Sequence, residues 1–130
     1  MPDETDQTED AIRAATGELR DARQSSGESQ EAQARLVAAL EALATLQAHA
    51  GDFEKAQSLY REAIETGEKA GAPAGQMASL RSGLATLFDF NNREDDAVPL
   101  YERAIEDLEK MQPPAGEDAA RLRNNVAMIY

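Results

Sequence analysis

The sequence contains no cysteine and no tryptophan, and it has a single histidine, His49. Without cysteine the chain can form neither disulfides nor thiolate metal sites. One histidine in a chain without cysteine also excludes a histidine-rich metal centre and the cysteine-based catalytic triads. We therefore expect no catalytic residues, no cofactor and no metal. His49 is expected near a helix end, where a cation suits the helix dipole.

Long apolar runs are also missing. No stretch approaches the roughly 18 apolar residues that a membrane span requires. The N-terminal segment MPDETDQTED has five acidic residues and lacks the basic or apolar character of a targeting peptide. We expect a cytoplasmic protein. Its 130 residues, of which 42% are hydrophobic, suit one domain with a modest core.

Positive charge is scarce. The chain has 13 basic and 25 acidic residues, which gives a net charge of -12. Such a surface repels phosphate backbones and anionic lipid heads, so nucleic acid is not an expected partner and direct membrane binding is disfavoured. Basic or neutral protein surfaces are the expected partners. The alternative is that the excess charge serves only solubility.

The sequence repeats itself. Residues 43–65 read LATLQAHAGDFEKAQSLYREAIE, and residues 84–106 read LATLFDFNNREDDAVPLYERAIE. The offset between matching residues, such as Ala56 and Ala97, is 41 positions. The same phrase begins again in RNNVAMIY, where the offset is 42. A period near 40 indicates stacked supersecondary units that cannot bury their apolar faces alone.

Within each unit the apolar spacing is helical, with steps of three and four residues. In the first unit the two stripes are Leu36, Leu40, Leu43 and Leu46, then Phe53, Ala56, Leu59, Tyr60, Ala63 and Ile64. Between them, Gly51 is predicted to stop one helix and Asp52 to cap the next. In the second unit, Asn91 and Asn92 are predicted to tolerate the left-handed conformation at this turn. Each unit is thus predicted to be a helical hairpin.

The predicted fold is all-α, with about six helices in helical-hairpin repeats. Proline and glycine mark the boundaries, as at Pro73, because the residue before proline avoids helical geometry. The predicted parts are an acidic N-terminal tail and helix at 1–27, and a repeat array at 28–130. The array divides into a first hairpin at 28–72, a second hairpin at 73–113, and a first helix of a third repeat, or a capping helix, at 114–130.

The acidic cluster Glu94, Asp95 and Asp96 could suggest an ion site. It lacks the ligand spacing and the glycine of a calcium loop. Acidic residues at a helix start favour the helix dipole, and we interpret the cluster in this way.

The repeat resembles the tetratricopeptide signature W-x2-L-G-x2-Y followed by A-x3-F. The matching residues are Leu40, Leu43, Ala44, Ala56 and Tyr60, then Leu84, Ala85, Phe88, Ala97 and Tyr101, then Val126, Ala127 and Tyr130. The repeat is longer than the usual one by about two helical turns, and with phrases such as AVPLYERAIE it resembles the kinesin light chain type. The chain departs from the family in having no tryptophan and no second helix in the third repeat. This resemblance implies an α-α superhelix.

The resemblance also implies a concave surface that is lined by the first helix of each hairpin and binds a protein partner. Projecting the repeat onto this chain gives the partner-binding candidates Glu41, Thr45, Ala48, Ser82, Thr86, Asp89, Arg121, Asn124, Asn125 and Met128. Asn124 and Asn125 resemble the paired asparagines of light-chain repeats. The alternative for each residue is an ordinary solvated helix face.

The implied function is that of a non-enzymatic interaction module. Bacterial proteins that resemble kinesin light chains are associated with bacterial tubulins, so the resemblance implies binding to a tubulin-like cytoskeletal filament, to stabilise it or to link it to cargo or membrane. One alternative is a generic peptide-binding adaptor or chaperone. Another is a self-assembling scaffold, in which a homo-oligomer forms through the C-terminal helix.

Overall fold

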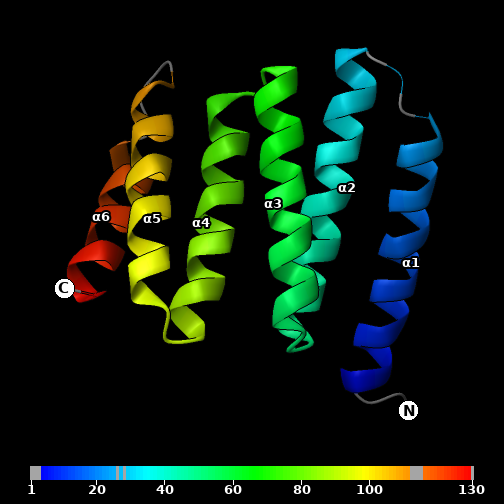
Figure 1. Ribbon diagram of the computed structural model, residues 1–130, viewed down its shortest axis with the longest axis horizontal. Helices are drawn as coiled ribbons and strands as arrows, with labels where there is room; N and C mark the ends of the chain where they lie inside the picture. The colour runs from blue at the N-terminus through cyan, green and yellow to red at the C-terminus, as the bar shows by residue number, and fades with distance from the viewer. Residues whose placement is uncertain (1–3, 26, 28, 112–115, 130) are drawn as a thin grey trace. The chain divides into compact units, whose positions relative to one another are not determined.

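The computed structural model describes residues 4–129 except 26, 28 and 112–115, and within them every regular element is an α-helix (Figure 1). The six helices are α1 (Glu4–Ser25), α2 (Gln30–His49), α3 (Phe53–Ala70), α4 (Ala74–Phe90), α5 (Glu94–Glu109) and α6 (Gly116–Ile129). The predicted all-α class with about six helices is confirmed.

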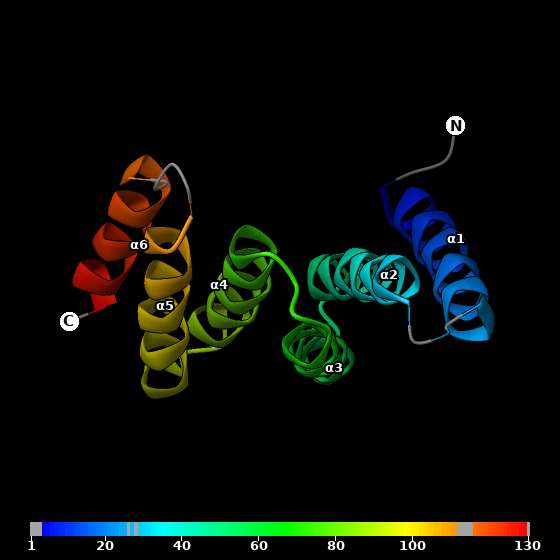
Figure 2. The ribbon, with the colours of Figure 1, turned by 90° about the horizontal axis from the view of Figure 1, so that it is seen from above.

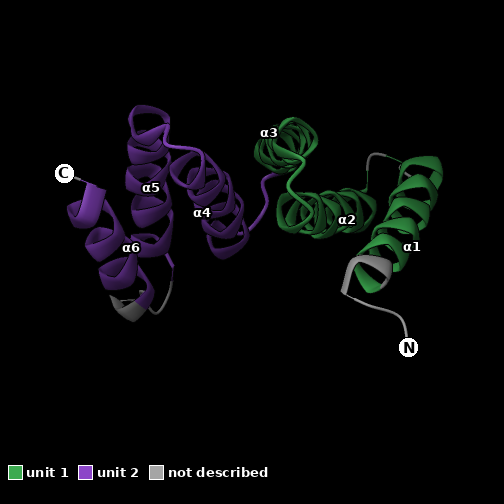
Figure 3. Ribbon diagram, turned by 90° about the horizontal axis from the view of Figure 1, so that it is seen from below, with its two compact units in different colours: residues 1–70 green, residues 71–130 purple. Residues whose placement is uncertain are grey.

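The chain forms two compact units, Met1–Ala70 and Gly71–Tyr130 (Figure 3). In the first unit, α2 packs against both α1 and α3, and in the second, α5 packs against both α4 and α6 (Figure 2). The N-terminal helix thus belongs to the first unit. The predicted division into 1–27, 28–72, 73–113 and 114–130 follows the repeats rather than compactness, and it stays a prediction.

The turn between α2 and α3 has the predicted chemistry. Gly51 lies in the left-handed region with φ 84°, where an L side chain is strained. The Asp52 carboxylate accepts a hydrogen bond from the Lys55 backbone N–H at 3.2 Å, which caps α3. The backbone N–H of Asp52 donates to the Gln47 carbonyl at 2.9 Å and closes the end of α2.

The corresponding turn between α4 and α5 follows the same path with other residues. Asn92 takes the left-handed conformation with φ 59°. The prediction was wrong for Asn91, whose φ is -103°. Asn91 acts instead as the end cap of α4, and its side-chain N–H donates to the Leu87 carbonyl at 2.8 Å. One left-handed residue is enough, because the Arg93 N–H then reaches the Phe88 carbonyl at 2.9 Å.

Helix α1 extends the repeat toward the N-terminus, a relation that the sequence pattern did not predict. Its buried residues Ala15, Leu19 and Ala22 each precede a buried residue of α3 by 41 positions. Those α3 residues are Ala56, Tyr60 and Ala63. A leucine stands where α3 and α5 have a tyrosine, and this change hides the relation in the sequence. Helix α1 therefore has the buried pattern of a second helix, and it packs on the first helix of the next repeat.

Candidate partner-binding surface

Three of the predicted binding residues share one face of α2 in the first unit. Glu41, Thr45 and Ala48 are separated by steps of four and three residues, which place them one above another. Thr45 is exposed, and Glu41 and Ala48 are half-buried. The Thr45 hydroxyl donates to the Glu41 carbonyl at 3.0 Å, which anchors it to its own helix. This face is polar and partly accessible.

The second unit presents the corresponding face of α4. Ser82, Thr86 and Asp89 follow the α2 residues by 41 positions and have the same degrees of exposure. The Ser82 hydroxyl donates to the Ser79 carbonyl at 3.1 Å. The two units thus display similar small polar faces, each on the first helix of its hairpin.

A hydroxyl pair joins the first helix to the second in both hairpins. The Thr45 and Tyr60 oxygens lie 3.1 Å apart, and the Thr86 and Tyr101 oxygens lie 3.0 Å apart. Burial raises the pKa of both tyrosines, and the threonine hydrogen bond opposes this rise in part. A nearby acid on the first helix, Glu41 or Asp89, adds to the rise in pKa. Both tyrosines are therefore neutral at physiological pH, and both threonines are held in position.

The remaining candidates lie on α6. Arg121 and Asn124 are exposed, and Asn125 is half-buried. Arg121 forms an ion pair with Asp118 at 3.5 Å within the helix. Met128 is 86% exposed, as is Phe90 at the end of α4. The structure thus leaves one amide, one guanidinium and one thioether accessible on this helix.

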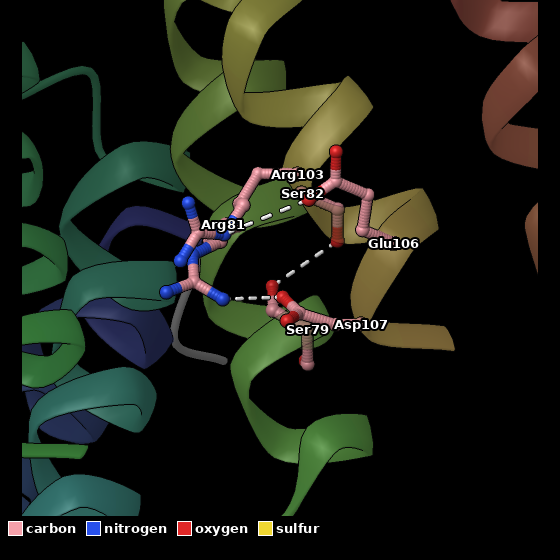
Figure 4. A network of polar contacts seen from close by, with 6 residues as sticks. All are labelled: Ser79, Arg81, Ser82, Arg103, Glu106 and Asp107. Carbon is pink, nitrogen blue, oxygen red and sulfur yellow. Dashed lines mark hydrogen bonds and ion pairs between the residues drawn. The ribbon is translucent and has the colours of Figure 1, made fainter. Parts of the chain in front are cut away.

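The second hairpin contains a buried ion pair that the sequence pattern did not predict. Arg81 of α4 donates a hydrogen bond from Nη1 to the Asp107 carboxylate of α5, and both residues are 5% exposed (Figure 4). Leu40 occupies the position of Arg81 in the first hairpin. A charged residue in a stripe that is otherwise apolar was the available signal. The pair joins two helices and exposes little surface to a ligand.

The acidic cluster lies at the start of a helix, as predicted. Glu94, Asp95 and Asp96 form the first turn of α5, and Asp96 accepts a hydrogen bond from the Arg93 guanidinium at 2.9 Å. Among the described residues, no group of three histidine or acidic side chains is arranged to hold a metal ion. None of the described helices is long and apolar enough to cross a bilayer.

The family model described as Tetratricopeptide repeat matches residues 35–110, which is more than half of the chain. No curated protein matches the sequence significantly. Among solved structures, BtubC (BKLC) from P. vanneervenii is similar, with a TM-score of 0.74 and 31% sequence identity. That match covers 94% of this chain and 48% of the other, so the chain spans about half the length of BtubC.

These matches agree with the hairpins, the period of 41 residues and the paired alanines and tyrosines described above. They confirm the predicted resemblance to tetratricopeptide proteins of the kinesin light chain type, whose repeats serve as protein-interaction modules. The chain belongs to the tetratricopeptide repeat family.

Proposed function

We propose that this chain is a non-enzymatic docking module that binds a tubulin-like bacterial filament in the cytoplasm, stabilising it or linking it to cargo or membrane. The observation that carries this proposal is the likeness to BtubC (BKLC), which extends over 94% of the chain at 31% identity. The resemblance to light-chain-type repeats adds the class of partner, because bacterial proteins of this kind are associated with bacterial tubulins.

The proposed contacts are the exposed face of α2 in the first unit and the exposed faces of α4 and α6 in the second, each taken by itself. Thr45 and Thr86 present hydroxyl groups that the tyrosine pairs hold in place. A fixed hydroxyl loses little conformational entropy when a partner binds, so these two positions suit recognition of a rigid protein surface. On α6, the exposed Asn124 amide can both donate and accept hydrogen bonds.

Met128 is the proposed apolar anchor of this surface. Its side chain is 86% exposed and adaptable in shape, and methionine is common at protein-binding surfaces. An apolar anchor beside polar groups is the usual composition of a binding hot spot and its rim. The net charge of -12 favours a partner site that is basic or neutral.

The direct test is co-sedimentation with bacterial tubulin filaments, with unpolymerised tubulin as the comparison. The full chain should sediment with the polymer and not with the unassembled subunits. Met128→Glu should weaken this binding about tenfold or more, since it places a charge at the proposed anchor. Ala14→Glu, at an exposed site on α1 outside the proposed contacts, is the matched control and should bind normally.

Failure to sediment with any bacterial tubulin polymer would overturn the filament proposal. Competition by a short extended peptide would favour the generic peptide-binding adaptor instead, because a filament docking module should recognise the assembled surface. Equal binding by Met128→Glu and the control would remove α6 from the proposed contact surface.

A further inference from the structure

The last turn of α4 exposes an aromatic ring next to a carboxylate. Phe90 is 86% exposed, and Asp89 beside it is half-buried. They follow Thr86 by four and three residues, so they lie one turn further along the helix, on either side of it. We call Thr86, Asp89 and Phe90 the α4 end site. All three residues belong to the second unit.

The shared plan of the hairpins does not require this ring and carboxylate. The corresponding residues of α2 are Thr45, Ala48 and His49, which precede those of α4 by 41 positions. The α2–α3 hairpin thus forms the same kind of turn with neither group. His49 is exposed as well, although the chain continues after it through a second hairpin. Exposure at this position therefore does not follow from where the sequence ends.

The Thr86 hydroxyl and the Asp89 carboxylate lie close together. The Thr86 and Tyr101 oxygens are 3.0 Å apart, which holds the threonine in position. Burial raises the pKa of Tyr101, and the negative charge of Asp89 adds to the rise, so this carboxylate lies near the hydroxyl pair. The α4 end site thus combines a hydroxyl, a carboxylate and an exposed phenyl ring.

The same unit shows how a ring and a carboxylate together hold a guanidinium. The Arg93 guanidinium carbon lies 4.9 Å from the centroid of the Phe88 ring, and Arg93 donates a hydrogen bond to Asp96 at 2.9 Å. Stacking on the ring and bonding to the carboxylate are compatible because the guanidinium is planar. Residues 89–96 carry four acidic side chains and one basic one. Since Asp96 pairs with that one, the region keeps a negative charge that attracts a cation.

We propose that the α4 end site binds an arginine side chain of the protein partner. The guanidinium stacks on the Phe90 ring, pairs with Asp89 and donates a hydrogen bond to the Thr86 hydroxyl. Arginine is preferred over lysine, because only the planar guanidinium stacks flat on a ring and offers paired donors to a carboxylate. This inference rests on the α4 part of the proposed contacts and specifies the chemistry that this part recognises.

A blocked Gly-Arg-Gly tripeptide tests the site without any filament. Titrated into the full chain, it should shift the NMR amide signals of residues 85–93 in a saturable manner. The same tripeptide with citrulline, a neutral isostere of arginine, should bind about fivefold more weakly because it cannot form the ion pair. The lysine tripeptide should also bind more weakly than the arginine tripeptide.

Variants of the full chain locate the site. Asp89→Asn and Phe90→Leu each remove one interaction with little change of volume, and each should weaken binding of the arginine tripeptide about threefold or more. Asp89→Ala with Phe90→His gives α4 the residues of α2 and should abolish the shifts. Glu106→Gln is the control and should bind normally, since this exposed acid lies in the last turn of α5, away from the site. Circular dichroism would establish that each variant keeps its helices.

The reciprocal change should create a second site. Ala48→Asp with His49→Phe should produce arginine-dependent shifts on α2, where Thr45 and Tyr60 already supply the hydroxyl pair. Equal binding of the arginine and citrulline tripeptides, or undiminished binding by Asp89→Asn and Phe90→Leu, would overturn the arginine site. None of these measurements uses tubulin. Failure of the chain to sediment with filaments would overturn the filament proposal alone, so the two failures are distinguishable.

Discussion

The hairpins α2–α3 and α4–α5 have one plan and different residues. Both bury the same alanines and tyrosines of their second helices, and both join a threonine to a tyrosine across the hairpin. Both also turn through one left-handed residue, which is Gly51 in the first and Asn92 in the second. Small residues at the close approach and one interhelical hydroxyl pair are therefore the constant part of this fold. The surrounding positions differ between the two hairpins.

The greatest difference lies in the core. The first hairpin has Leu40, which is 0% exposed, and Thr66 at the positions where the second has Arg81 and Asp107. A buried ion pair gains attraction and loses hydration, and the two terms roughly cancel against an apolar pair of similar volume. The second hairpin thus replaces non-directional burial with a directional contact. We therefore expect the two hairpins to reach similar stability by different means.

The two turns also differ in the contacts that hold the start of the second helix. Asp52 caps α3 with its side chain, whereas Arg93 at the start of α5 makes no such capping bond. Arg93 is held instead by Asp96 and by the Phe88 ring, whose centroid is 4.9 Å from the guanidinium carbon. An exposed ion pair and a cation–π contact are each worth up to about 1 kcal/mol. Together they offset much of the missing cap.

The largest predicted effect comes from replacing only one residue of the buried Arg81–Asp107 pair. Asp107→Thr places the residue of the first hairpin opposite Arg81 and deprives that buried guanidinium of the Asp107 carboxylate. We expect the free energy of unfolding to fall by about 3–5 kcal/mol. Arg81→Leu with Asp107→Thr restores both residues of the first hairpin. This double variant should be close to the parent or more stable by about 1–4 kcal/mol.

Urea denaturation followed by circular dichroism measures both changes. Leu40→Ala in the first hairpin is the reference for ordinary loss of core contacts, with an expected cost of about 2–5 kcal/mol. If the double variant is as unstable as Asp107→Thr, the two hairpins do not have interchangeable cores.

An intermediate effect is expected at Pro99, which lies inside α5 where the first hairpin has Ser58 in α3. Proline lacks the backbone N–H and is unfavourable in a helix interior by about 3 kcal/mol relative to alanine. Pro99 is exposed, so its replacement leaves no cavity. Pro99→Ser should stabilise the protein by about 2 kcal/mol, measured by the same denaturation. Ser58→Pro is the reciprocal control and should destabilise it by a similar amount.

Much of the fold could be predicted because the repeat brings local signals into agreement. The steps of three and four residues predicted the helices, and Gly51 with Asp52 predicted the first turn, since each has one physical role there. The repeat in helix α1 was not predicted because Leu19 stands where the other second helices have tyrosine. Asn91 was assigned the wrong conformation because either of two adjacent asparagines can adopt the left-handed region.

The candidate surface was harder to predict than the fold. Repeat spacing placed Thr45 and Thr86 on accessible faces, and both lie there. It could not show that each hydroxyl is already bonded to a tyrosine on the next helix, because that contact depends on how two helices approach. The Arg81–Asp107 pair was missed for the same reason, since the two residues are 26 positions apart. Partners separated in sequence require the packed structure.

The smallest expected effect concerns the feature that the hairpins share, the threonine–tyrosine pair. Burial raises the pKa of Tyr60 and Tyr101 in the fold above the ordinary value of 10.0. The fold therefore favours the neutral phenol. This contribution to stability is fully present below pH 10 and is lost as the pH rises through the raised pKa values.

Tyr60→Phe and Tyr101→Phe remove one ionisable phenol each. At neutral pH each should cost about 1 kcal/mol or less, the usual net value of one hydrogen bond. Above pH 10 each variant should lose less stability than the parent, because it has one phenol fewer to ionise. Urea denaturation below and above pH 10, with tyrosinate absorbance as a second readout, measures this. If only one of the two variants loses less stability than the parent above pH 10, the two threonine–tyrosine pairs have different environments. The hairpins then differ even in the contact that they share.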